Sequence, residues 1–340
     1  MYKQEEGTFR SSKDDFQIYW HAWLPAKGRT KRVLVVQHGF GEHCGRYQNV
    51  VQEFDRTETA IFALDSRGHG KTGGKRGHVD QFQLYVDDLA DLIRLAREKT
   101  GFEKVILLGH SLGGVIALQY ALEGTNESNL VALIVSAPAV EVQMDFEKRV
   151  KKFIGQALAN FSPATTVDAN LDLSFLSHDQ SVIEAYRNDP LVHGKISFQM
   201  GKNMFSVGES IYQKVNHLTI PVYIFHGAAD QIAAPRGSEK VFSLLTTGRK
   251  KLHIYDGLYH ETMNELSPHK EEVLHDLREW ILETERAVGT GAQKKRSIKK
   301  ANKKVAKKKK AAKKGRAQSG AARPAKKKSG ARGRKKASRR

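Results

Sequence analysis

The sequence lacks the features typical of secreted disulfide-rich or membrane-spanning proteins. It contains a single cysteine, Cys44, so no intrachain disulfide can form. No run reaches the roughly 18 apolar residues needed to cross a bilayer. The N-terminal stretch MYKQEEGTFRSSKDDFQIYW has no apolar core of a signal peptide. We therefore predict a cytoplasmic protein, with any membrane or nucleic-acid association being peripheral.

Acidic residues are absent from the C-terminal segment 289–340, which carries 24 Lys and Arg residues. Residues 1–288 carry 33 basic and 37 acidic side chains, so the sequence pI of about 9.8 reflects the segment and not the rest of the chain. The composition of segment 289–340 does not allow it to bury enough apolar surface to fold. We predict a folded domain over 1–288 and a disordered tail over 289–340.

The tail resembles the tails of histone H1 in composition, and it has no aromatic residue that could stack on a base. We expect it to bind a polyanion through phosphate contacts. The spacing of its basic clusters by Ala and Gly favours nucleic acid over an anionic membrane surface. A merely solubilising extension is the alternative.

Signals for cofactors and metals are also missing. No G-x-G-x-x-G opens a helix, and His, Cys, Asp and Glu are not clustered at ligand spacing. We expect neither a dinucleotide nor a metal ion.

The sequence does contain short apolar runs that alternate with helical patterns. The expected strands are 33–36, 59–64, 105–108, 131–135, 222–225 and 252–255, after an edge hairpin formed by 7–10 and 16–24. The expected helices are 47–54, 80–99, 115–120, 237–245 and 270–285. This order predicts an α/β fold, with a mostly parallel sheet covered by helices on both faces.

The alternation stops between about 139 and 216, where we predict a helical cap inserted after a central strand. An apolar stripe at helical spacing runs from Phe146 to Phe161, with basic residues beside it. The stripe is suited to roof an acyl channel, and equally to contact an anionic membrane surface. Both interpretations stay open.

One motif points to nucleophilic chemistry. Gly109-His110-Ser111-Leu112-Gly113 is a G-x-S-x-G that ends a buried strand and opens a helix. A turn this tight forces its serine onto a strained backbone and exposes the hydroxyl. We predict that Ser111 is a nucleophile and that His110 packs against the sheet.

A serine nucleophile needs a histidine base and a carboxylate that orients it. His260 follows the strand 252–255, and Asp230 follows the strand 222–225. Because carboxyl ends of parallel strands meet at one edge, we predict the triad Ser111, Asp230, His260. Asp256 is the alternative acid, disfavoured because it begins the same loop as His260.

Two backbone N–H groups must also stabilise the oxyanion. Leu112 follows the nucleophile, and Phe40 lies between two glycines in the loop after strand 33–36, so we assign the oxyanion hole to them. Glu42 and Arg46 are candidates for binding a polar head group, or they form a structural ion pair.

Five motifs together resemble the monoacylglycerol lipase and lysophospholipase group of α/β-hydrolases: QHGFGEHCGRY, LDSRGHGKTGG, LGHSLGG, IFHGAADQIAAP and IYDGLYHETMNE. The segment NDPLVHGKIS, at 188–197, is similar to that group's cap. The resemblance covers roughly 7–285. It implies a serine esterase with this triad and these oxyanion donors, and a cap that forms an apolar acyl channel.

We therefore expect hydrolysis of single-acyl-chain lipid esters, most simply monoacylglycerol to glycerol and fatty acid. A lysophospholipase or short-chain carboxylesterase with the same triad is the nearest alternative. A nucleic-acid-associated scaffold is the alternative from another class, although a scaffold has no need for a complete triad.

Overall fold

The structure is a computed structural model that describes residues 2–27, 29–143 and 162–289. The predicted tail and the apolar stripe at 146–161 lie outside the described residues.

An eight-stranded sheet forms the centre of the described part, in the order β1-β2-β4-β3-β5-β6-β9-β10. Its strands are β1 (Tyr2–Arg10), β2 (Gln17–Pro25), β3 (Arg32–Gln37), β4 (Thr59–Leu64), β5 (Val105–His110), β6 (Leu130–Ser136), β9 (Val222–Gly227) and β10 (Lys250–Tyr255). The six strands from β4 to β10 pair in parallel, whereas β1 and β2 form an antiparallel hairpin at one edge. The expected mostly parallel sheet with an edge hairpin is confirmed.

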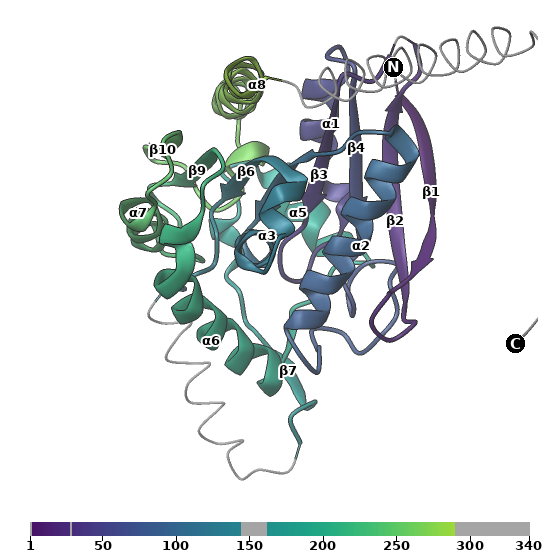
Figure 1. The fold of residues 1–340 in the computed structure, drawn as a ribbon. Helices are drawn as coiled ribbons and strands as arrows, with labels where there is room; N and C mark the ends of the chain where they lie inside the picture. Colours follow the sequence, from purple (N-terminus) through teal and green to yellow (C-terminus); the bar gives the residue numbers. More distant parts are fainter. Residues whose placement is uncertain (1, 28, 144–161, 290–340) are drawn as a thin grey trace, which may run out of the picture. The chain divides into compact units, whose positions relative to one another are not determined.

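Helices cover both faces of this sheet (Figure 1). They are α1 (Gln48–Phe54), α2 (Gln83–Thr100), α3 (Leu112–Leu122), α7 (Pro235–Leu244) and α8 (His269–Val288). Val33 and Val35 of β3 belong to an apolar cluster with α2 and α3, whereas Leu34 and Val36 belong to a second cluster with α1 and α8. The period-two alternation of side chains along a strand produces these two layers.

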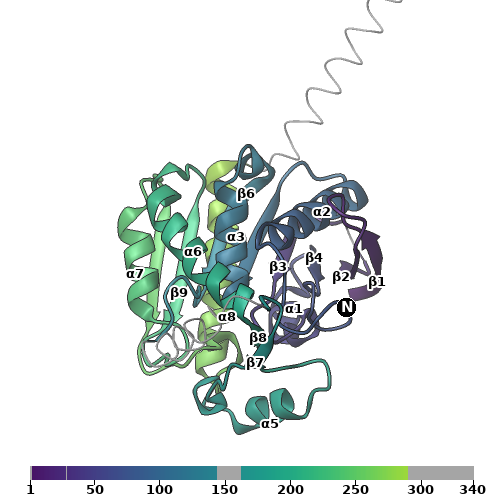
Figure 2. The same cartoon turned by 90° about the horizontal axis from the view of Figure 1, so that it is seen from below.

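The part of the insertion between β6 and β9 that the structure describes contains a small antiparallel sheet and two α-helices. These are β7 (Thr166–Asp168) paired with β8 (Lys195–Ser197), α5 (Gln180–Asn188) and α6 (Phe198–Lys214). Figure 2 shows β7, β8 and α5 beside one another. The N–H of His193 donates to the carbonyl of Gly41 at 2.9 Å, so the insertion contacts the loop that follows β3. We call the described part of this insertion, 162–216, the cap.

Short 3-10 helices complete the described elements, at Cys44–Arg46, Asn126–Asn129, Leu173–Phe175, Val215–His217 and Thr262–Asn264. The parallel strands β3, β5, β9 and β10 all deliver their carboxyl ends to the same edge of the sheet, where α/β folds place their ligands. The loop after β3 (38–43, the β3 loop) and the loop after β10 (256–261, the histidine loop) meet there.

Candidate active site

Ser111 occupies a strained turn between β5 and α3. Its φ of 54° and ψ of −120° lie where a residue with a side chain is rarely found. Only glycine fits at the flanking positions: a Cβ on Gly109 would lie 2.3 Å from the carbonyl oxygen of Gly113. The structure thus contains the elbow that the G-x-S-x-G spacing predicts.

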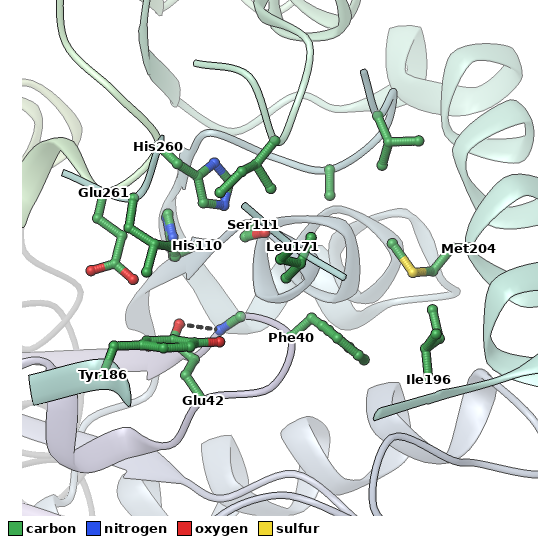
Figure 3. Close-up of a pocket in the computed structure, with 15 residues that line it drawn as sticks. Phe40, Glu42, His110, Ser111, Leu171, Tyr186, Ile196, Met204, His260 and Glu261 are labelled. Carbon is green, nitrogen blue, oxygen red and sulfur yellow. Dashed lines mark hydrogen bonds between the residues drawn. The ribbon is translucent and has the colours of Figure 1, made fainter. Parts of the chain in front are cut away.

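His260 lies in the histidine loop and lines the same pocket as Ser111, above which it is drawn in Figure 3. Its Nδ1 is 2.6 Å from Oδ2 of Asp230, and both side chains are buried. The alternative acid, Asp256, is exposed at the beginning of the same loop. The structure therefore places His260 at the same pocket as Ser111 and pairs it with Asp230, and the catalytic roles of the three residues stay a prediction.

The buried Asp230 carboxylate is held by several donors. Oδ1 accepts the N–H groups of Ile232 and Ala233 at 2.7 and 3.0 Å, and Oδ2 also lies 2.8 Å from Nε2 of His226. Burial alone would raise the pKa of Asp230, but the charge of His260 and hydrogen bonds from both histidines lower it below its usual range. The carboxylate is thus ionised and fixed in orientation.

The pKa of His260 is shifted in the opposite direction, upward. Burial alone would lower its pKa, but the charge and hydrogen bond of Asp230, with the charges of Glu261 and Glu42, raise it above 6.5. His110 packs beside it, with ring centroids 4.8 Å apart, and contacts Oγ of Ser136 at 3.2 Å. Burial lowers the pKa of His110 to about 4, which keeps this neighbour neutral.

The backbone segments that carry the predicted oxyanion donors lie close to Ser111. Leu112 is the first residue of α3, where backbone N–H groups have no acceptor within the helix. The β3 loop passes close by, since a Cβ on Gly39 would lie 3.1 Å from Cβ of Ser111. Phe40 follows Gly39 and lines the same pocket. The structure thus places both backbone segments beside the serine.

Glu42 and Arg46 form an ion pair, as one of the two interpretations from the sequence expected. Nη1 of Arg46 lies 2.9 Å from Oε2 of Glu42 and 2.7 Å from Oε1 of Glu261. Glu42 lines the pocket. Binding of a head group by either residue stays a prediction.

The pocket around Ser111 has an apolar side and a polar side. Figure 3 shows Met204 and Ile196 on one side of Ser111, and Glu42, Glu261 and Tyr186 on the other. The remaining lining residues are Gly39, Phe40, His110, Ala139, Val142, Leu171, Leu176, Ile232 and His260. An ester with one apolar and one polar arm matches this division.

In residues 2–27, 29–143 and 162–289, no group of three or more His, Cys, Asp and Glu side chains is arranged to hold a metal ion. No helix within these ranges is long and apolar enough to span a bilayer.

Comparison with known proteins identifies the family. The family Hydrolase_4, described as serine aminopeptidase S33, matches residues 28–267. The chain belongs to this hydrolase family. Monoacylglycerol lipase of Mycolicibacterium smegmatis is 34% identical over 267 residues, which cover 78% of this chain and 93% of that protein. Monoglyceride lipase of Rattus norvegicus is 29% identical, covering 79% of this chain and 88% of that protein.

A solved structure agrees with these relatives. The crystal structure of Paleococcus ferrophilus monoacylglycerol lipase superposes with a TM-score of 0.70 at 28% identity, covering 78% of this chain and 99% of that one. Both the α/β-hydrolase fold and the resemblance to the monoacylglycerol lipase group are confirmed.

Sequence reasoning missed three residues of this hydrolase site. His226, at the end of β9, contacts Asp230. Glu261 directly follows His260, and its bidentate contact with Arg46 spans 215 positions of the chain. Tyr186 reaches the pocket from the cap. Only His226 had a local signal, since it lies four residues before Asp230 at the end of a strand.

Proposed function

We propose that the chain is a serine ester hydrolase that cleaves single-chain lipid esters, with monoacylglycerol as the principal substrate class. The observation that supports this most is the hydrogen-bonded His260–Asp230 pair facing an elbow serine in a two-sided pocket. The names of the relatives point to the same substrate class.

In the proposed mechanism, Oγ of Ser111 attacks the acyl carbonyl carbon while Nε2 of His260 takes the hydroxyl proton. Asp230 holds the imidazole in the required tautomer and stabilises the imidazolium. The N–H groups of Phe40 and Leu112 stabilise the oxyanion. His260 then protonates the departing alcohol, and a water molecule deprotonated by His260 releases the fatty acid.

The acyl chain lies on the side of Leu171, Ile196 and Met204, and the alcohol lies on the side of Glu42 and Glu261. The pKa of Glu261 is lowered because the charge of Arg46 outweighs the effect of burial, so its carboxylate is ionised. Two carboxylates sharing one guanidinium leave a net negative charge, which disfavours a phosphate-bearing leaving group. We therefore place monoacylglycerol ahead of lysophospholipid.

A hydrolysis panel tests this proposal. Purified protein and Ser111→Ala are assayed on monoacylglycerols, lysophospholipids and short p-nitrophenyl esters of defined chain length. We expect the highest kcat/KM on monoacylglycerol and no turnover by Ser111→Ala. Preference for lysophospholipid or for acetate esters would transfer the assignment to one of those alternatives, and absence of all turnover would favour the scaffold.

We further propose that the chain divides at about residue 288 into a catalytic domain and a tail that binds polyanions. Support comes from the 24 basic and no acidic residues of 289–340. Contacts with several phosphates release counterions, so affinity for duplex DNA should fall steeply with salt. Truncation after Val288 should abolish DNA binding at about 50–100 mM salt and leave kcat/KM on a short soluble ester unchanged.

The tail assay distinguishes three outcomes. If the truncated protein shifts duplex DNA as well as the full chain does, the polyanion role is wrong. If only anionic vesicles retain the full chain, the partner is a membrane surface and not nucleic acid. Equal behaviour of both proteins towards DNA and vesicles would leave a solubilising extension.

A further inference from the structure

Glu261 is a buried carboxylate that lines the pocket but takes part in no bond-making or proton-transfer step of the proposed mechanism. It directly follows His260 in the histidine loop and is 5% exposed. Its two oxygens accept Nη1 and Nη2 of Arg46 at 2.7 and 2.8 Å, and Oε2 also accepts Nδ2 of Asn264 at 2.8 Å. Its own N–H donates to the carbonyl of Leu176 in the cap at 2.8 Å. Every part of this residue is therefore engaged.

Arg46 continues the connection into the β3 loop. Its Nη1 also donates to Oε2 of Glu42 at 2.9 Å. The other oxygen of Glu42 accepts the N–H of Gly39 at 2.6 Å, the contact drawn as a dashed line in Figure 3. Gly39 precedes Phe40, the proposed oxyanion donor. A continuous chain of short contacts thus runs from the residue after His260 to the residue before Phe40.

The cap covers this chain of contacts. The guanidinium carbon of Arg46 lies 4.6 Å from the ring centroid of Tyr186 in α5. A cation over an aromatic face is favourable, and more so away from water. The ion cluster formed by Glu42, Arg46 and Glu261 is therefore shielded from solvent. Away from water its hydrogen bonds are stronger and hold its geometry more firmly.

We propose that Glu261 is a positioning residue, which through Arg46 and Glu42 holds the β3 loop in register with the histidine loop. The inference rests on the proposed function, because it assumes that Phe40 and His260 act on the ester. The cluster links the β3 loop, which carries Phe40, to the histidine loop, which carries His260. Without it, these two loops would be connected only through the strands that precede them.

Stability alone gives a weak reason for this cluster. A buried ion pair contributes little net stability, because removing both charges from water offsets most of their attraction. Two buried carboxylates that share one arginine contribute even less to stability than a single ion pair, because one negative charge is left unbalanced. By contrast, a displacement of about 1 Å between the nucleophile, the base and the oxyanion donors can lower the rate about 100-fold.

The cluster also acts on the base electrostatically. The charged or titratable groups facing His260 are Asp230, Glu261, Glu42 and the neutral His110. Loss of the negative charge at 261 therefore lowers the pKa of His260. Because the base acts when neutral, the acid limb of kcat/KM then moves to lower pH.

The test compares Glu261→Gln with Glu285→Gln on a short p-nitrophenyl ester. Glu285 is a matched control, since its buried carboxylate pairs with Arg32 at 2.7 Å and does not line the pocket. We expect Glu261→Gln to lower kcat about 10- to 100-fold with KM changed less than about threefold, and to move the acid limb to lower pH. Glu285→Gln should change thermal stability without either effect.

Arg46→Lys is the second variant, for use if Glu261→Gln does not fold. It keeps the positive charge and loses the bidentate geometry, so kcat should fall by a smaller factor with little change in KM. Wild-type kinetics in both folded variants would overturn the proposal, as would an unmoved acid limb in Glu261→Gln. Loss of activity only in proportion to lost folded protein would also overturn it. Ser111→Ala, assayed in parallel, separates these results from failure of the serine mechanism itself.

Discussion

Replacing Asp230 with Asn isolates the role of the carboxylate, because the structure dictates how the amide must sit. The N–H groups of Ile232 and Ala233 both donate to Oδ1, so the amide oxygen takes that place. The amide NH₂ then occupies the position of Oδ2 and faces Nδ1 of His260 from 2.6 Å. Nδ1 must accept a hydrogen bond, which moves the ring proton to Nε2. That nitrogen can then no longer take the proton of Ser111.

The wrong tautomer should lower kcat by about 10⁴, which corresponds to about 5.4 kcal/mol at 1.36 kcal/mol per factor of ten. The assay is steady-state hydrolysis of a soluble ester by Asp230→Asn, with circular dichroism to verify folding. Asp256→Asn, at the exposed alternative acid, is the control and should retain activity within about threefold. Retention of more than about 1% of kcat by Asp230→Asn, or a larger loss in Asp256→Asn, would refute this assignment.

Three further predictions follow from the pKa shifts and the pocket lining. The raised pKa of His260 predicts that kcat/KM falls as pH drops through a midpoint above the ordinary pKa of histidine, and a midpoint at or below that ordinary pKa would contradict it. The lowered pKa values of Asp230 and Glu261 contribute stability above about pH 4.5, which should be lost as pH falls further; urea unfolding that is equally stable at pH 6 and pH 3 would disagree. Leu171→Ala and Met204→Ala should lower kcat/KM on long-chain esters about tenfold relative to acetate esters, whereas equal losses on both would indicate damage to the fold.

The sheet could be predicted from the sequence because its central strands are continuous apolar runs. The strand expected at 59–64 has those bounds in the structure. The strand expected at 222–225 begins as expected and continues two residues further, to Gly227. The N-terminal strand was expected to begin at Gly7 but begins at Tyr2. Its first residues, YKQEE, show no apolar alternation, and their pairing with β2 is what makes them a strand.

The triad could be predicted because its members follow strands that the sequence marks clearly. The rule that carboxyl ends of parallel strands converge was enough to choose His260 and Asp230 and to prefer Asp230 over Asp256. Glu261 and Tyr186 could not be found in this way. Their roles depend on contacts with Arg46, which is distant in the chain and becomes a neighbour only after the cap and the two loops are folded.

The proposed hydrolysis requires that Ser111 form an acyl-enzyme, which covalent labelling of the serine can detect. A fluorophosphonate reacts with an activated serine, and mass spectrometry of the digested protein locates the adduct. We predict one adduct at Ser111 in the wild-type protein, none in Ser111→Ala, and loss of monoacylglycerol hydrolysis in the labelled protein. An adduct at another residue, or turnover by Ser111→Ala above about 1% of wild type, would show that Ser111 is not the nucleophile.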